Sequence, residues 1–223
     1  MEIFIDSTNP KDIIEAGSLV KLTGVTTNPS LIAAGGPDKE KTLADVLDVS
    51  PGPVFAQAIG WHDPEPLMAQ ARWLHRYSDR IIVKLPMSPA GIQALTRLKD
   101  SDPGMQIAIT AVASVSQAYL CAKQGADIVA LFNGPLDVAV ETPVEIVAPV
   151  IQMLDNYGFA TKVLSCGRFP RHFAEFAISG SHICTLKLEF LKLLFDHPYT
   201  DKRMHGFLGD WQKVFGDTTW PTE

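Results

Sequence analysis

The sequence predicts a single (β/α)8 barrel of the α/β class, also called a TIM barrel, with one extra helix at its C-terminal end. Eight short apolar runs are spaced along the 223 residues, and amphipathic helix-like stretches follow most of them. No linker, low-complexity tract or clear repeat interrupts this alternation. We expect residues 1–200 to form the barrel and residues 201–223 to form a helical extension of the same domain. A doubly wound open sheet is the competing arrangement of the same units.

The apolar runs have the length and composition of strands buried in a parallel sheet. They span residues 3–6, 24–27, 54–58, 81–86, 106–110, 128–132, 162–166 and 182–185. The helix-like stretches include residues 64–77, 90–98, 114–123, 143–156 and 170–178. Two of them follow Asp63-Pro64 and Ser88-Pro89, where an oxygen-bearing side chain can cap the first helical turn and proline fits its first position.

The last helix-like stretch, residues 202–215, follows the eighth unit. Its Phe207, Trp211 and Phe215 recur every four residues and therefore share one helix face. The default expectation is that this apolar stripe packs on the rim of its own barrel. The alternative is that it docks on a neighbouring subunit.

Charge and composition exclude several classes of function. The net charge of -6 and the pI near 5.5 argue against nucleic acid and anionic membranes as partners. No apolar stretch approaches the roughly 20 residues that cross a bilayer, and the N-terminus lacks the features of a signal peptide. Cys121, Cys166 and Cys184 form no close pair, so we expect reduced thiols and a cytoplasmic protein. The absence of a zinc spacing, a P-loop and a dinucleotide fingerprint leads us to expect neither a metal nor a cofactor.

Polar and aromatic residues fall at the ends of the predicted strands, where barrel active sites are built. They lie 22 to 29 residues apart, about one β/α unit each, and are Asp6, Asn28, Gln57, Lys84, Thr110 and Phe132, the last sharing a strand face with Ala130. For Asp6 or Asn28 taken alone, a turn or helix-cap role is the preferred interpretation. Their common placement around one mouth favours a shared site instead.

Lys84 is the most informative of these residues, because it lies inside an apolar strand, residues 81–86, that reads as buried on both faces. Burial of an ammonium group is costly and lowers the pKa of the amine. A neutral lysine is a nucleophile that can form a Schiff base with a carbonyl substrate. The ordinary alternative is a lysine at a strand end whose stem reaches water.

The chain resembles the transaldolase family, and in particular its short branch, which includes the fructose-6-phosphate aldolases. The resemblance covers nearly the whole sequence. Its matching segments are Ile5-Asp6-Ser7, Gly24-Val25-Thr26-Thr27-Asn28-Pro29-Ser30, Phe55-Ala56-Gln57, Ile82-Val83-Lys84-Leu85-Pro86, Ile109-Thr110-Ala111 and Asp210-Trp211-Gln212. It implies a (β/α)8 barrel that forms a ring-like homo-oligomer, a pentamer or decamer, with the C-terminal helix packed on a neighbour.

The resemblance also implies a class I aldol mechanism on sugar phosphates, without a metal. Lys84 would form an imine with a ketose phosphate, and Asp6 would take the proton of the fourth-carbon hydroxyl. Asn28 would hydrogen-bond the dihydroxyacetone unit that remains on Lys84. Gln57 and Thr110 would position water for imine formation and hydrolysis. The other residues assigned to substrate binding are Thr27, Ala130, Phe132 and Arg168.

Two positions that decide the fate of this dihydroxyacetone unit point in opposite directions. Phe132 stands where transaldolases typically carry phenylalanine and the aldolases carry tyrosine, and a phenylalanine cannot help to deliver a proton to the enamine. This favours group transfer. Gln57 favours the aldolase instead, because transaldolases usually have glutamate at this position and the aldolases have glutamine. An amide holds water without acting as a base.

The expected phosphate site also departs from the family pattern. Pro135 stands where the family usually has an arginine, and Ser165-Cys166-Gly167 shows an apparent one-residue deletion near a usual serine. Arg168 matches the second basic position, and Arg171 is a possible substitute. Loss of an arginine partner weakens phosphate recognition by roughly 1.5–3 kcal/mol, so we expect a high Michaelis constant for phosphorylated acceptors.

Three functions follow from these observations. The first is a transaldolase of the non-oxidative pentose phosphate pathway, which moves dihydroxyacetone from fructose 6-phosphate or sedoheptulose 7-phosphate to an aldose phosphate. The second is a fructose-6-phosphate aldolase that releases free dihydroxyacetone. The third is a sugar-phosphate binding protein that has kept the fold and lost turnover.

Overall fold

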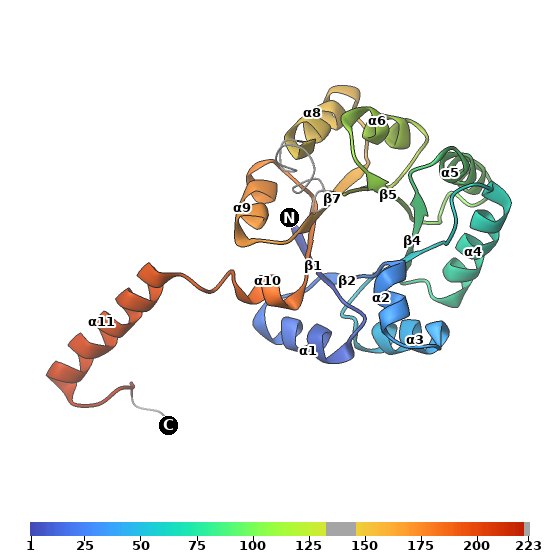
Figure 1. Ribbon diagram of the computed structural model, residues 1–223. Coiled ribbons are helices and arrows are strands. Elements are labelled where there is room, and N and C mark those ends of the chain that lie inside the picture. The colour runs from blue at the N-terminus through green and yellow to red at the C-terminus, as the bar shows by residue number, and fades with distance from the viewer. Residues whose placement is uncertain (133–145, 221–223) are drawn as a thin grey trace.

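The computed structural model describes residues 1–132 and 146–220 and shows eight parallel strands closed into a barrel (Figure 1). The strands run in chain order: β1 (Glu2–Asp6), β2 (Gly24–Thr26), β3 (Val54–Gln57), β4 (Ile81–Pro86), β5 (Ile107–Val112), β6 (Ile128–Leu131), β7 (Lys162–Gly167) and β8 (Ile183–Leu186). The barrel closes because β8 pairs with β1, with Ile183 opposite Glu2. This closure confirms the predicted (β/α)8 barrel and excludes the open sheet.

Helices lie around the barrel and connect its strands, and two more helices follow β8 in the described residues (Figure 1). They are α1 (Pro10–Leu19), α2 (Pro29–Ala34), α3 (Lys39–Val49), α4 (Pro64–Tyr77), α5 (Pro89–Ser101), α6 (Val115–Lys123), α8 (Val147–Tyr157), α9 (Pro170–Ile178), α10 (Leu188–Lys192) and α11 (Pro198–Phe215). The predicted caps are confirmed. Asp63 Oδ1 accepts a hydrogen bond from the Glu65 amide at 2.9 Å, and Ser88 Oγ accepts one from the Gly91 amide at 3.0 Å. The first three residues of the helix predicted over 143–156 lie outside the described part of the chain.

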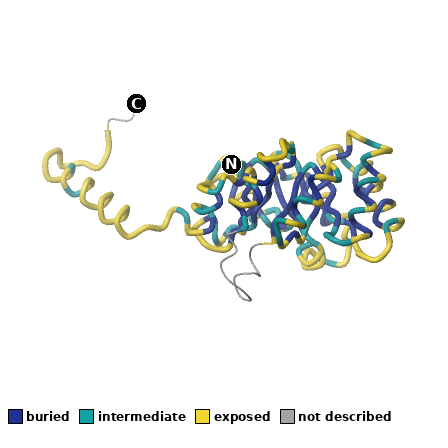
Figure 2. Tube along the Cα trace, turned by 90° about the horizontal axis from the view of Figure 1, so that it is seen from above, coloured by how far each residue is buried: buried dark blue, intermediate teal, exposed yellow. Residues whose placement is uncertain are grey.

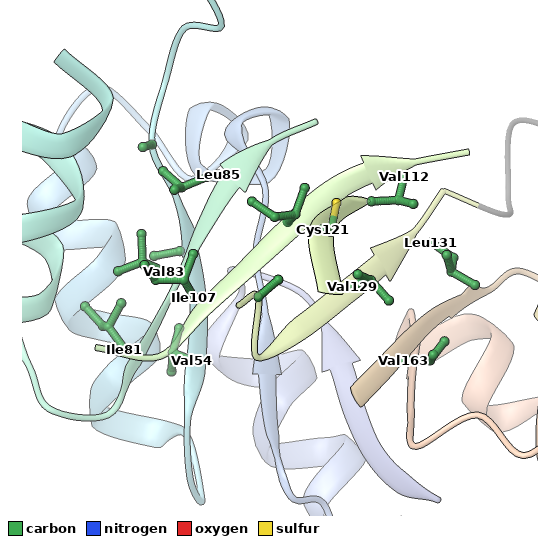
Figure 3. Close-up of a cluster of buried hydrophobic side chains, with 14 of the residues drawn as sticks. Val54, Ile81, Val83, Leu85, Ile107, Val112, Cys121, Val129, Leu131 and Val163 are labelled. Atoms are coloured by element: carbon green, nitrogen blue, oxygen red, sulfur yellow. The ribbon is translucent and has the colours of Figure 1, made fainter. Parts of the chain in front are cut away.

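Two apolar layers hold the barrel together, one inside it and one between its strands and helices. The interior layer consists of Phe4, Phe55, Ile82, Ala108, Ile128, Ala130, Leu164 and Ile183. The outer layer is larger, and Figure 3 shows one sector of it, in which strand residues such as Val83, Leu85 and Val112 point toward the helices. Since successive strand residues alternate between the two layers, each strand has one inward position near its carboxyl end.

The C-terminal helix does not pack on its own barrel. α11 begins at Pro198, four residues before the predicted start, and projects away from the other helices (Figures 1 and 2). None of its eighteen residues, all of them described, is buried. The default expectation, that the apolar stripe packs on the rim of its own barrel, is therefore wrong. The direction of α11 carries its apolar face out of reach of that rim (Figure 1 and Figure 2). Over the described residues, no helix has the length and apolar character that a membrane crossing requires.

Tight packing of α5 against β4 generates a prediction about stability. A methyl group at Gly91 would collide with the backbone carbonyl oxygen of Pro86, which cannot rotate away. Gly91→Ala should therefore lower the free energy of unfolding by about 1–3 kcal/mol, as overpacking does. Urea denaturation followed by circular dichroism measures this change.

Gly17→Ala is the matched control, because no atom lies within 4 Å of a methyl group placed at this helical position in α1. It should raise the free energy of unfolding by roughly 0.5–1 kcal/mol, the usual gain from replacing glycine by alanine inside a helix. Equal effects of the two substitutions would contradict the packing of α5 on the end of β4.

Candidate active site

A cavity of about 640 Å³ opens at the carboxyl ends of the strands. It is of the size of small-molecule sites and stands where barrel active sites are built. Eight of the nine predicted site residues line it: Asp6, Asn28, Gln57, Lys84, Thr110, Ala130, Phe132 and Arg168. The structure therefore brings together side chains from seven strands or from the one or two residues that follow them.

Lys84 is buried on the inner face of β4, with only 7% of its surface exposed. Its strand neighbours in register are Gln57 on β3 and Ala108 on β5. This exposed fraction is too small for an ammonium group in bulk water, so the picture of a strand-end lysine that reaches solvent is wrong. Within the described residues, Lys84 forms no ion pair and no side-chain hydrogen bond.

Burial lowers the pKa of Lys84 from its ordinary value, and the nearby Cys166 and Asp6 oppose this change. The dominant cause is the removal of water from the amine. A larger share of this lysine is therefore neutral near pH 7 than of an exposed lysine. The neutral amine is the nucleophilic form.

Asp6 ends β1 on the inner face and lies at the end of a short chain of hydroxyl groups. Its Oδ1 accepts a hydrogen bond from Thr26 Oγ1 at 2.8 Å, and Thr26 Oγ1 lies 2.7 Å from Thr185 Oγ1. A hydroxyl has one proton, so Thr26 donates to Asp6 and Thr185 donates to Thr26. Oδ1 is thus occupied as an acceptor, and Oδ2 is the oxygen left to exchange a proton with a ligand.

Burial raises the pKa of Asp6 above its ordinary value of 3.8. The hydrogen bond from Thr26 and the positive charges of Lys84, Lys187 and Arg168 oppose this shift without reversing it. The pKa of the carboxyl group and that of the Lys84 amine therefore move toward each other. Groups in a cleft whose pKa values are shifted by burial and by specific charged neighbours are typical of functional sites.

Asn28 combines the two roles that the sequence left open. Its Oδ1 accepts a hydrogen bond from the Leu31 amide at 3.0 Å and caps α2, while the residue also lines the cavity. Because the cap uses the oxygen of the side-chain amide, the Nδ2 group is the part of Asn28 that can donate to a ligand. The cap holds the side chain in place at the cavity wall.

Thr110 stands at an irregular point of β5. The register between β5 and β6 shifts between Ile109 and Val112, and Ala111 adopts φ 63° in the left-handed region. A non-glycine residue in this region costs about 1–3 kcal/mol, and such strain is concentrated at functional sites. Bulges beside active sites re-aim side chains, and this one directly follows Thr110.

Gln57 ends β3 and reaches the cavity by the regular alternation of strand residues, without a bulge.

Thr27 is the one predicted site residue that does not reach the cavity. It is fully buried, and its Oγ1 donates to the Phe55 carbonyl at 2.7 Å. Since β2 ends at Thr26, alternation directs Thr26 inward and Thr27 into the surrounding structure. Thr26, and not Thr27, is the threonine that lines the cavity, and a substrate contact at Thr27 stays a prediction.

Sequence reasoning missed two residues with ionisable side chains at the mouth, Cys166 and Lys187. Both follow the alternation that located Asp6, because Cys166 faces inward near the end of β7 and Lys187 lies two residues beyond the inward-facing Thr185. Burial raises the pKa of the Cys166 thiol to about 12. Arg171 lies outside the cavity, with its guanidinium carbon 5.9 Å from the centre of the Phe169 ring, so the suggested substitution by Arg171 is not supported.

Pro135 lies outside the described residues. In the described part of the chain, no group of three or more His, Cys, Asp or Glu side chains is placed to hold a metal ion.

The cost of burying Lys84 predicts an effect on stability. Lys84→Met should raise the free energy of unfolding at pH 7 by more than the ~0.5 kcal/mol typical of surface substitutions, because it removes a desolvated amine. The pKa of Lys84 in the folded state lies below its ordinary value of 10.5. Between these two pKa values the unfolded wild-type chain binds more protons than the folded one, so the free energy of unfolding of the wild type rises with pH. The advantage of Lys84→Met should shrink as the pH approaches 10.5.

Urea denaturation between pH 7 and pH 10 measures this difference. Lys123→Met is the control, because Lys123 is exposed at the far end of α6, and it should change the free energy of unfolding by no more than about 0.5 kcal/mol at any pH. A Lys84→Met variant that is less stable than wild type at pH 7 would show that the buried amine is better compensated than its surroundings indicate.

Comparison with known proteins agrees with the geometry of the site. A model of the transaldolase/fructose-6-phosphate aldolase family matches residues 3–219. A probable transaldolase of Desulfotalea psychrophila is 36% identical over 214 residues, which cover 96% of this chain and 99% of that protein. A probable transaldolase of Herpetosiphon aurantiacus is 34% identical over 215 residues (96% of each chain), and one of Lactiplantibacillus plantarum is 36% identical over 213 residues (95% and 97%). This chain therefore belongs to the transaldolase/fructose-6-phosphate aldolase family.

Proposed function

We propose that the protein is a transaldolase that works through a Schiff base on Lys84. It transfers a dihydroxyacetone unit from fructose 6-phosphate or sedoheptulose 7-phosphate to an aldose phosphate. The observation that carries this proposal is the shared cavity of Lys84 and Asp6, whose pKa values burial moves in opposite directions. The family and the names of its relatives support the same activity.

The first half of the reaction forms the imine and breaks a carbon–carbon bond. The neutral Lys84 amine adds to the ketone carbon of the donor, and loss of water gives the imine. Asp6 takes the proton of the fourth-carbon hydroxyl through Oδ2, and the electron pair of the bond between the third and fourth carbons moves into the imine. An aldehyde leaves, and the three-carbon unit remains on Lys84 as an enamine. Asn28 Nδ2 is placed to hold the hydroxyl groups of this unit.

In the second half, the enamine attacks the carbonyl carbon of an aldose phosphate. A new carbon–carbon bond forms, Asp6 returns its proton to the new hydroxyl, and water hydrolyses the imine to free Lys84. Gln57 and Thr110 have no side-chain hydrogen bonds to other described residues, so both are available to hold that water. An amide cannot remove a proton from the water, so Gln57 can hold the water without acting as its base.

The rim residue Phe132 favours transfer over release of free dihydroxyacetone. It lines the cavity with 48% of its surface exposed and brings no hydroxyl group to the enamine. Protonation of the enamine is therefore unassisted from this side, and the enamine persists until an acceptor arrives. Gln57 supports the second candidate, a fructose-6-phosphate aldolase, because it matches the residue that those enzymes usually carry.

The test is the release of glyceraldehyde 3-phosphate from fructose 6-phosphate, with and without erythrose 4-phosphate. Release that requires the acceptor is the expected result and indicates a transaldolase. Release at a similar rate without the acceptor, together with free dihydroxyacetone, would indicate the aldolase.

Lys84→Arg should abolish turnover in both assays, because a guanidinium stays protonated and cannot add to a ketone. Lys123→Arg, at the opposite end of the barrel, should leave the rate unchanged. Full activity of Lys84→Arg would contradict the Schiff-base mechanism. Absence of turnover in the wild-type protein would favour the sugar-phosphate binding protein.

We also propose a pathway, a compartment and an oligomeric state for the enzyme. Its substrates belong to the non-oxidative pentose phosphate pathway, and the free thiols of Cys121, Cys166 and Cys184 suit a reducing cytoplasm. The exposed apolar face of α11 suits a homo-oligomer in which this helix covers a second copy of the chain. Its most exposed apolar residues include Met204, Phe207, Leu208, Val214 and Phe215.

Removal of residues 198–223 should therefore reduce the oligomer to a smaller species, as measured by light scattering after size-exclusion chromatography. Phe207→Glu should have a similar effect because it places a charge on the apolar face of α11. Lys202→Glu, on the opposite face of the same helix, should not. A full-length protein that is monomeric, or a truncated protein of unchanged oligomeric state, would contradict this assembly.

A further inference from the structure

Two basic side chains flank each other on the rim of the cavity. Arg168 directly follows β7, and Lys187 directly follows β8. These strands pair in parallel, and the last pair in register is Gly167 opposite Leu186. The next residues are therefore Arg168 after β7 and Lys187 after β8. Their backbones lie one strand spacing, about 4.8 Å, apart. Both side chains line the cavity.

The backbone on both sides is anchored. The Arg168 amide donates to Nδ1 of the buried His172 at 3.3 Å. The Lys187 carbonyl accepts hydrogen bonds from the amides of Phe190 and Leu191 at 3.1 and 3.0 Å. These contacts hold the start of each side chain at the rim, so little backbone ordering is left for a ligand to impose.

Neither cation has an acidic partner among the described residues, since no ion pair of Arg168 or Lys187 occurs over 1–132 and 146–220. Most other rim residues are neutral, and the carboxylate that both cations influence, Asp6, lies deeper in the cavity. Two unpaired, adjacent positive charges over a cavity attract an anion. The loops after the seventh and eighth strands are also the frequent phosphate-binding position of (β/α)8 barrels.

We propose that Lys187 acts with Arg168 as the phosphate clamp of this site, an inference that rests on the proposed function. Arg168 offers a planar fork for two phosphate oxygens, and Lys187 adds a point charge from the neighbouring strand end. Their two charges match those of a phosphate monoester near pH 7. The expectation of weak phosphate binding rested on Arg168, with Arg171 as a possible substitute, and Lys187 is a second cation that it did not include.

The first measurement is independent of turnover. Glycerol 3-phosphate has a phosphate group but no ketone, so it can occupy the clamp without forming an imine. Isothermal titration calorimetry should show that the dissociation constant rises about 10- to 100-fold in Lys187→Met and in Arg168→Met, which is the range for loss of a charged hydrogen bond. Lys187→Arg should stay close to wild type because it keeps the charge.

Two control substitutions remove the same charges elsewhere. Lys123→Met lies at the opposite end of the barrel, and Arg171→Met removes the guanidinium that lies against Phe169 outside the cavity. Neither should change the affinity for glycerol 3-phosphate. Equal affinity of wild type and Lys187→Met, or equal losses in the control variants, would overturn the clamp.

The second measurement compares kcat/KM for fructose 6-phosphate with kcat/KM for fructose. The ratio of the two should fall about 10- to 100-fold in Lys187→Met and be restored in Lys187→Arg, with most of the change in KM. A fall in kcat for both sugars with an unchanged ratio would mean that Lys187 acts on Asp6 or on folding, and would overturn the inference. Lys187-dependent binding of glycerol 3-phosphate without turnover of any sugar would support the clamp while the proposed function fails.

Discussion

Burial of one amine is the constraint on which the rest of this site depends. Lys84 lies inside a closed barrel, between the side chains of β3 and β5, and the loss of water lowers its pKa. The same lack of water raises the pKa of Asp6. One physical cause thus shifts the pKa values of both groups, in the directions that the proposed mechanism uses. Neither effect requires the two groups to form a direct ion pair, which would instead hold both in their charged forms.

The barrel supplies this burial because its strands alternate between two apolar layers. Inward positions at the bottom and middle of the barrel are filled by residues such as Phe4, Phe55 and Ile82. Near the carboxyl ends the inward positions become polar, so the same alternation that packs the core places Asp6, Gln57, Lys84 and Thr110 in the cavity. Rigid strand ends hold these groups with little freedom to adapt. Strain at Ala111 and the hydroxyl chain from Thr185 through Thr26 to Asp6 adjust the geometry locally.

Most of the fold and of the site could be predicted from the sequence because both follow from this period of two residues. The eight apolar runs, the proline-initiated helices and the inward faces of β1, β3, β4 and β5 needed only local patterns. Thr27 lies outside the cavity because the end of β2 depends on its pairing with β3, and a shift of one residue exchanges the inward threonine for the outward one. Lys187 was missed because the end of β8 lies beyond its predicted span. The direction of α11 could not be predicted, since an amphipathic pattern identifies the apolar face of a helix and not the surface that covers it.

The proposed mechanism requires that Lys84 is the residue that bonds to the substrate. Sodium borohydride added during incubation with fructose 6-phosphate reduces an imine to a stable amine, and peptide mapping by mass spectrometry then locates the adduct. A Schiff base on Lys84 predicts a reduced dihydroxyacetone adduct on the peptide that contains Lys84, and no adduct in Lys84→Arg. An adduct on another lysine, or none in a protein that turns over the sugar, would contradict it.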